Sequence, residues 1–207
     1  MRRLPDRGHY DEASIHSILD AAFLCHVSFS IDGQPFTIPT LYGRKGNSLF
    51  LHGSSASRAL RELQKGIPAC ISVAIVDGLV LARSAFHHSI NYRSVVAYGT
   101  ARLVEDPDAK MAALLAVSEN VIPGRWDEVR PPTPLEMKAT AVIEFEIEEA
   151  SAKVRTGDPK DDEEDYELPI WAGVLPLRTV SEPPVDDGRV KDGVAVSASA
   201  QNYRPRK

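Results

Sequence analysis

The sequence predicts a mainly β protein, built as a small antiparallel barrel of roughly six strands with a few helices between them. Three observations support this prediction. Apolar and polar residues alternate over several short segments, as they do in strands with one buried face. Turn residues separate most of these segments, and such short connections join antiparallel strands. Between the strands, two longer segments carry apolar residues at helical spacing.

The first elements are a helix and a hairpin. Apolar residues recur at helical spacing over residues 11–20, and strand alternation then follows over residues 21–31. Residues 32–35 have the composition of a turn, and residues 36–42 form the returning strand. Pro39 cannot donate a ladder hydrogen bond, so this strand is expected at an edge, bulged or open at that point. A ligand could contact backbone groups there.

The middle of the chain alternates between strands and tight turns. A third strand covers residues 48–52 and leads through a serine-rich loop into a short helix that Gly66 closes. Residues 68–76 form a near-continuous apolar strand. Asp77 and Gly78 then predict a hairpin, from which residues 79–86 return. Residues 94–104 form another long strand.

The last strand is expected to close the barrel. Asp106 caps a helix that ends before Pro123, and a short helical piece precedes a one-sided strand over residues 141–149. The acidic run at residues 160–165 is expected to be solvated, and the apolar residues 168–177 to return to the core. We expect a domain over residues 1–178 and an extended or poorly ordered tail over residues 179–207, lying on a partner subunit.

Charge and composition exclude several classes of protein. The formal net charge of -5 gives no reason to expect nucleic acid as a partner. No apolar run reaches the roughly 18 residues of a membrane-spanning helix, so we expect a soluble cytoplasmic protein. Cys25 and Cys70 lie in apolar strands and are expected to be buried thiols rather than a disulfide or a catalytic pair. No Cys, His, Asp and Glu cluster has metal-ligand spacing.

The loop between the third strand and its helix is the best local candidate for a binding site. Serine hydroxyls at positions 54, 55 and 57 and the charge of Arg58 suit a phosphate group. A plain serine cap beside a solvated arginine explains the same residues. His52 precedes the loop, where it could point at a ligand or satisfy a backbone carbonyl.

Four separated blocks of the sequence resemble one protein family. They cover residues 38–42, 49–58, 77–95 and 169–176. In these blocks the chain resembles the flavin-nucleotide-binding branch of the pyridoxamine 5'-phosphate oxidase-like family, which includes relatives of the 5-nitroimidazole resistance proteins. The resemblance extends over residues 10–178 and leaves the tail outside it.

The resemblance implies an FMN-binding split β-barrel that works as a homodimer with a flavin between the subunits, and FAD is the alternative to FMN. By position, one strand would run along the isoalloxazine ring, a loop would surround the phosphate, two residues would support the site, and an aromatic residue would cover it from the other subunit. In that order, the implied residues are Ile38, Pro39, Thr40, Leu41 and Tyr42; His52, Gly53, Ser54, Ser57 and Arg58; Arg93 and Ser94; and Trp171. Trp171 as a core anchor and Arg93 as a surface ion-pair partner remain alternatives.

Three functions follow from this implication. The first is a flavin-dependent oxidoreductase acting on a small-molecule substrate, with NADH or NADPH as the electron donor. The second is a flavin-binding module for storage, sensing or delivery, since no acid and base pair stands out and no catalytic residue can be assigned. The third is a haem-binding split barrel with His52, His87 or His88 as the axial ligand. Vitamin B6 synthesis is disfavoured, because residues 201–206 match the expected C-terminal arginine and histidine motif only weakly.

Overall fold

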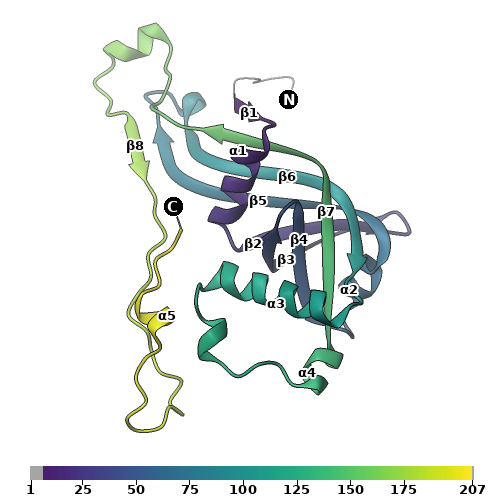
Figure 1. Ribbon diagram of the computed structural model, residues 1–207. Helices are drawn as coiled ribbons and strands as arrows, with labels where there is room; N and C mark the ends of the chain where they lie inside the picture. The colour runs from purple at the N-terminus through teal and green to yellow at the C-terminus, as the bar shows by residue number, and fades with distance from the viewer. Residues whose placement is uncertain (1–6, 207) are drawn as a thin grey trace.

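A closed β-barrel forms the centre of the computed structural model, which describes residues 7–206 (Figure 1). Its strands are all antiparallel and pair in the order β7-β4-β3-β2-β5-β6, and pairing of β6 with β7 closes the ring. The predicted six-stranded antiparallel barrel is therefore confirmed. The strands of the ring are β2 (Leu24–Ile31), β3 (Gln34–Lys45), β4 (Ser48–Ser54), β5 (Lys65–Leu81), β6 (Ser89–Leu103) and β7 (Thr140–Arg155). Outside the ring, β1 (Gly8–His9) pairs with β7, and β8 (Gly173–Pro176) pairs with β5.

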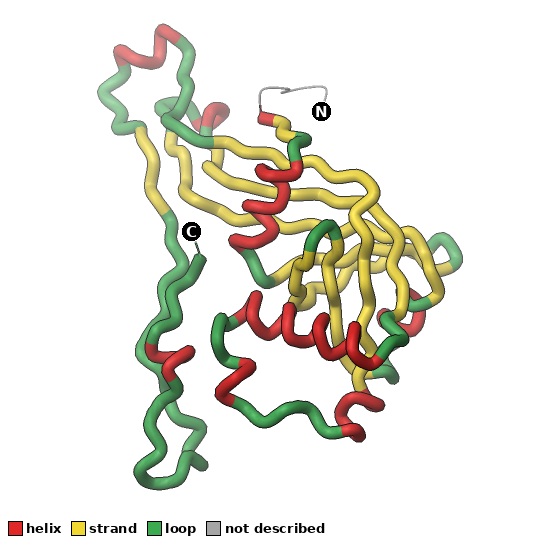
Figure 2. The backbone as a smooth tube through the Cα atoms, viewed as in Figure 1, coloured by secondary structure: helices red, strands yellow, loops and turns green. Residues whose placement is uncertain are grey.

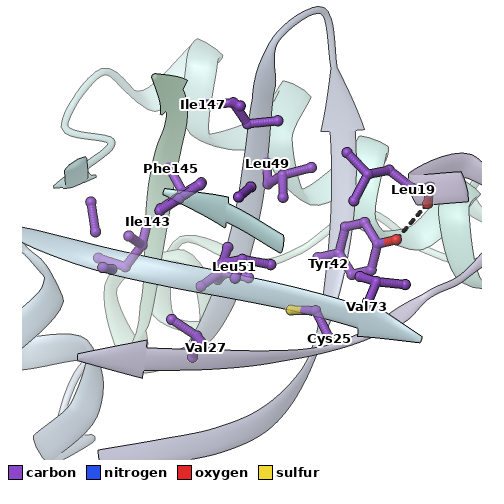
Figure 3. Packing of buried hydrophobic residues seen from close by; sticks show 14 of the residues in the cluster. Leu19, Cys25, Val27, Tyr42, Leu49, Leu51, Val73, Ile143, Phe145 and Ile147 are labelled. Atoms are coloured by element: carbon purple, nitrogen blue, oxygen red, sulfur yellow. Dashed lines mark hydrogen bonds between the residues drawn. The ribbon is translucent and has the colours of Figure 1, made fainter. Parts of the chain in front are cut away.

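Side chains fill the interior of the barrel (Figure 3). In β2, alternate residues are buried because successive side chains point to opposite faces of a strand. Leu49 and Leu51 of β4 are fully buried, as is Phe145 of β7. Tyr42 of β3 also lies in this core, where its hydroxyl donates a hydrogen bond to the Leu19 carbonyl. With its interior filled, the barrel can hold a large ligand only on its outside.

Among residues 7–206, four α-helices connect or cover the strands and a fifth lies in the C-terminal tail (Figure 2). They are α1 (Glu12–Ala21), α2 (Arg58–Leu63), α3 (Pro107–Val121), α4 (Pro134–Ala139) and α5 (Ala198–Gln201). The Asp11 carboxylate caps α1 by accepting the Ser14 amide at 2.8 Å, and Asp106 caps α3 by accepting the Ala109 amide at the same distance. None of the helices in residues 7–206 is both long and apolar enough to cross a membrane.

The long helix α3 lies directly against the outer side of β3. The contact is close because Gly43 has no side chain: a Cβ there would stand 2.4 Å from the Ala116 carbonyl carbon. Asn120, near the end of α3, donates hydrogen bonds to the Ala22 and Tyr42 carbonyls at 3.0 and 2.8 Å. These contacts fix one wall of the cavity described below.

The hairpin predicted at Asp77 and Gly78 is wrong. Strand β5 continues through this point to Leu81, with a bulge in its pairing to β6 between Val76 and Gly78. The Asp77 carboxylate accepts two hydrogen bonds from Arg93 of β6, at 2.8 and 2.9 Å. Gly78 allows the backbone of β8 to approach, since a Cβ would lie 3.0 Å from the Leu175 oxygen. The chain turns only after Leu81, so β6 also begins earlier than predicted.

Two expectations for the segment after β7 are corrected as well. Most of the acidic run is exposed as expected, but Asp161 is not: its side chain is 0% exposed and accepts hydrogen bonds from the Arg83 amide and guanidinium at 2.9 and 3.1 Å. The apolar residues 168–177 do not return to the core. They form β8 along the edge of β5, and Trp171 remains 68% exposed.

The tail leaves the barrel after β8 and then returns to it (Figure 1). The part of the tail that runs away from the barrel is extended, and α5 lies in the part that runs back toward it. Arg206 ends the described chain by donating hydrogen bonds to the Asp20 and Glu119 carbonyls and to the Asn120 side chain. The C-terminal end of the tail is thereby held against α1 and α3.

Candidate functional site

The first half of β3 has an open edge. Residues 34–41 pair with β2, but pairing with β4 begins only at Tyr42. The prediction that the strand is open at Pro39 is therefore confirmed. Both backbone polar groups of Tyr42 are already hydrogen-bonded: its amide donates to the Phe23 carbonyl at 3.2 Å, and its carbonyl accepts from the Asn120 side chain.

Hydrogen-bonded and non-hydrogen-bonded pairs alternate along an antiparallel ladder. Because Tyr42 is bonded to Phe23, the backbone groups of Ile38 and Thr40 also point toward β2. Those of Pro39 and Leu41 point to the open edge. Of residues 38–42, which the family resemblance places along the flavin ring, only Pro39 and Leu41 can therefore offer backbone groups to a ligand.

The serine and arginine loop lies at the end of β4, beside this open edge. The Ser54 hydroxyl accepts the Ala56 amide at 3.2 Å, and the Ser57 hydroxyl makes no capping bond to α2. The guanidinium of Arg58 stacks over Phe36 of β3, 4.9 Å from the ring centre, and pairs with no carboxylate among residues 7–206. An exposed cation without an acidic partner suits an anion. The helix α2 is only six residues long, so its dipole adds little.

His52 lies two residues before Ser54, on the same strand β4. It is on the outer face of β4 and lines a cavity of about 630 Å³ between the barrel, α3 and α4. Most of the cavity wall is apolar, with Leu41, Leu114 and Val117 among its residues. The Nδ1 atom of His52 is buried and has no hydrogen-bond partner. Burial lowers the pKa of His52, which keeps the imidazole neutral near pH 7.

The polar groups of this cavity lie mainly around α4. Arg130 and Glu136 form a bidentate pair at 2.6 and 2.8 Å, and the Thr140 hydroxyl donates to the Glu136 carbonyl at 2.8 Å. Trp126 and Met137 complete this side. Sequence reasoning missed the cavity. The signal for it was α3, which is apolar on more than one face: Ala113 is buried, while Leu114 lines the cavity.

The remaining predicted residues lie at the opposite end of the barrel from Arg58. Arg93 forms the ion pair with Asp77, and the Ser94 hydroxyl points to the Lys153 carbonyl at 3.5 Å. Trp171 lies just before β8, on the edge of β5 that is farthest from α2 (Figure 1). A single chain therefore does not bring these three residues to the serine loop. A second cavity of about 1020 Å³ lies between Arg93 and the returning tail.

The other two candidate histidines already have partners. The Nδ1 atom of His88 accepts the Ala82 amide at 2.9 Å, and Nε2 of His87 lies 3.2 Å from an Asp162 oxygen. Within the described part of the chain, no group of three or more His, Cys, Asp or Glu side chains could hold a metal ion by itself.

The closed antiparallel barrel with a filled interior defines a split-barrel protein. The chain belongs to the pyridoxamine 5'-phosphate oxidase family, whose sequence model matches residues 11–154. The family expected from the sequence blocks is thereby confirmed. No curated protein is significantly similar to the chain in sequence.

Solved structures resemble the chain over nearly its whole length. The flavocytochrome Anf3 from Azotobacter vinelandii is 41% identical, with a TM-score of 0.91 over 99% of this chain and 95% of its own. An FAD and haem binding protein from Mycobacterium smegmatis is 35% identical, with a TM-score of 0.92 over 97% of this chain and 98% of its own. A 5-nitroimidazole antibiotic resistance protein from Bacteroides thetaiotaomicron shares the fold, at 21% identity and a TM-score of 0.59 over 71% of this chain and 87% of its own.

Proposed function

We propose that this protein binds a flavin nucleotide and a haem and transfers electrons between a nicotinamide nucleotide and a small-molecule acceptor. Two similar structures, at 41% and 35% identity, are described as a flavocytochrome and as an FAD and haem binding protein. The observation that carries the proposal is the unpaired Arg58 beside the open edge of β3, with the unpartnered His52 two residues before Ser54 on the same strand. Arg58 would bind the flavin phosphate and His52 would face the haem, so the two groups would bind at separate positions.

The flavin is proposed to lie along the open edge of β3. Backbone groups of Pro39 and Leu41 would meet the polar edge of the isoalloxazine ring, because they face away from β2. The hydroxyls of Ser54 and Ser57 and the Arg58 guanidinium would bind the phosphate. Charge-assisted hydrogen bonds to a phosphate are strong, and within residues 7–206 Arg58 would not have to give up a carboxylate partner to form them. This half of the site is common to FMN and FAD.

A second copy of the chain is proposed to complete the flavin site. Arg93, Ser94 and Trp171 cannot reach Arg58 within one chain, because they lie at the far end of β5 and β6. Trp171 is 68% exposed and Ile170 is 48% exposed, which leaves apolar surface for an interface. A homodimer would place these residues of one subunit over the open β3 edge of the other.

The haem is proposed to occupy a separate, apolar place on the chain. When bound, the two groups would supply hydride transfer at the flavin and one-electron chemistry at the iron. The task of the protein is then to hold both, to exclude water and to fix their separation. His52 and Ser54 lie on the same face of β4, roughly 7 Å apart along the strand, so the two places are neighbours.

An absorption spectrum of the purified protein, before and after adding haemin and FAD or FMN and desalting, tests the proposal. We expect a flavin band near 450 nm and a haem Soret band near 400 nm on the order of one each per chain. Anaerobic NADPH or NADH should bleach the flavin band. Retention of flavin without bleaching by either nucleotide would favour storage or sensing, and a protein that holds neither group would refute the proposal.

The identity of the flavin nucleotide is settled by releasing it and separating FMN from FAD by chromatography. We favour FAD, because the relative from Mycobacterium smegmatis is described as binding it. Sedimentation measures the mass of the loaded protein and tests the homodimer. A loaded monomer would mean that Trp171 and Arg93 take no part in the site.

A further inference from the structure

Of the six histidines in the chain, the sequence singled out three as examples of a haem ligand, and their surroundings distinguish these three. An axial ligand must be neutral and must keep a nitrogen lone pair free. In His88, Nδ1 already accepts a hydrogen bond from the Ala82 amide at 2.9 Å. In His87, Nε2 lies 3.2 Å from the Asp162 carboxylate, which favours a proton on that nitrogen. Both histidines are thus engaged in holding the turn between β5 and β6.

His52 has none of these commitments. Its Nδ1 atom is buried without a hydrogen-bond partner, a condition that costs free energy in a structure without a ligand. The carboxylate that lines the same cavity, Glu136, is held in the pair with Arg130. No carboxylate is therefore left to draw a proton onto the imidazole, and burial lowers the pKa of His52 further.

The cavity around His52 has the size and chemistry of a site for a large apolar ring. Its volume of about 630 Å³ falls within the range of roughly 300–1,000 Å³ that is usual for small-molecule sites. Leu114, Val117 and Val121 of α3 form one side, and Trp126 and Met137 lie across from the barrel. Arg130 is the cation among the lining residues, and its guanidinium is paired with the Glu136 carboxylate at the rim of the cavity.

The geometry points to His52 as the axial ligand of the haem, held in the cavity between β4 and α3 and apart from the flavin phosphate. This inference rests on the proposed function and assigns its haem to one place. It removes His52 from the phosphate-binding group that the family resemblance implies and leaves Ser54, Ser57 and Arg58 there. The turn histidines His87 and His88 then have a structural role.

The test compares His52→Ala with His87→Ala, each loaded with haemin and with FAD. We expect His52→Ala to lose the Soret band of the wild type, or to bind haemin at least about 10-fold more weakly, and to keep its flavin band. The retained flavin band shows that the barrel is folded. His87→Ala should keep both bands. Added imidazole should restore a ligated-haem spectrum to His52→Ala, because the deleted side chain leaves room for it.

A second variant tests the cavity without changing the ligand. Leu114→Trp fills part of the space from α3 and should lower haemin affinity while His52 is still present. The flavin band should again be unchanged.

Two results would overturn the assignment. A His52→Ala protein with the wild-type haem spectrum would move the ligand elsewhere, and a His52→Ala protein that loses flavin but keeps haem would return His52 to the phosphate site. Both differ from failure of the proposed function, in which the wild-type protein itself would bind no haem.

Discussion

Replacing Gly43 by alanine adds a methyl group where the backbone of α3 already lies. The new Cβ would stand 2.4 Å from the Ala116 carbonyl carbon and 2.5 Å from both the Ala116 oxygen and the Val117 amide nitrogen. Carbon atoms in contact are normally about 3.5–4.0 Å apart, so α3 has to retreat by on the order of 1 Å. Backbone atoms cannot rotate out of the way as a side chain can.

We therefore expect a loss near the upper end of the usual range for overpacking, about 3 kcal/mol of unfolding free energy. For a chain of 150 to 250 residues, this corresponds to a fall in Tm of roughly 6–12 °C. Urea unfolding followed by circular dichroism measures the loss, and an unchanged slope with urea shows that the same surface is exposed on unfolding.

Gly53→Ala is the matched control for this variant. Its Cβ would meet only the end of the Leu60 side chain, at 3.0 Å, and that side chain can move. Its stability should stay within about 1 kcal/mol of the wild type. If Gly43→Ala were as stable as Gly53→Ala, the close seating of α3 on β3 would be wrong.

Three further predictions concern the candidate sites and the core. Arg58→Ala should weaken flavin binding by about 1.5–3 kcal/mol, or roughly 10- to 150-fold in a fluorescence titration, whereas Arg102→Ala on β6 should leave it unchanged; equal effects would move the phosphate elsewhere. Because burial lowers the pKa of His52 below the ordinary value of about 6.5, the unfolded chain binds the proton first as the pH falls. The haem-free protein should therefore lose stability from about pH 6.5 downward, and His52→Leu should flatten that decline in urea unfolding at pH 5 and pH 7. Burial raises the pKa of Cys25 to about 12, so a thiol reagent at pH 8 should label Cys70 first in the native protein and both cysteines only after unfolding, as read by mass spectrometry.

The sequence predicted the barrel because each strand of the ring buries one face. Alternation marked β2 and the first part of β7, where Ile143 and Phe145 are fully buried. Local chemistry also marked the start of α3, since the carboxylate of Asp106 accepts an amide hydrogen bond from Ala109, three residues ahead. These signals lie within a few residues of the structure that they predict.

The predictions that failed depended on partners far away in the chain. Asp77 and Gly78 are a strong local turn signal, yet Asp77 pairs with Arg93 and Gly78 makes room for Leu175. Neither contact can be seen before β6 and β8 are placed. Likewise, the apolar composition of residues 168–177 favours a covered position, but it does not say whether the cover would be their own core or another chain.

The position of His52 shows how much of a site depends on the third dimension. On the sequence it stands next to Gly53 and Ser54, and this favours a place at the phosphate. His52 and Ser54 share the outer face of β4, but His52 lines a cavity whose other walls come mostly from residues 114–140, more than 60 positions later. A histidine that ends in an apolar cavity without a hydrogen-bond partner is poorly suited to bind a phosphate, because burial opposes the protonated form that a phosphate would prefer. The same conditions suit an iron ligand, which must be neutral. Assigning His52 therefore required α3 and α4 to be in place, and no pattern within β4 could have distinguished the two roles.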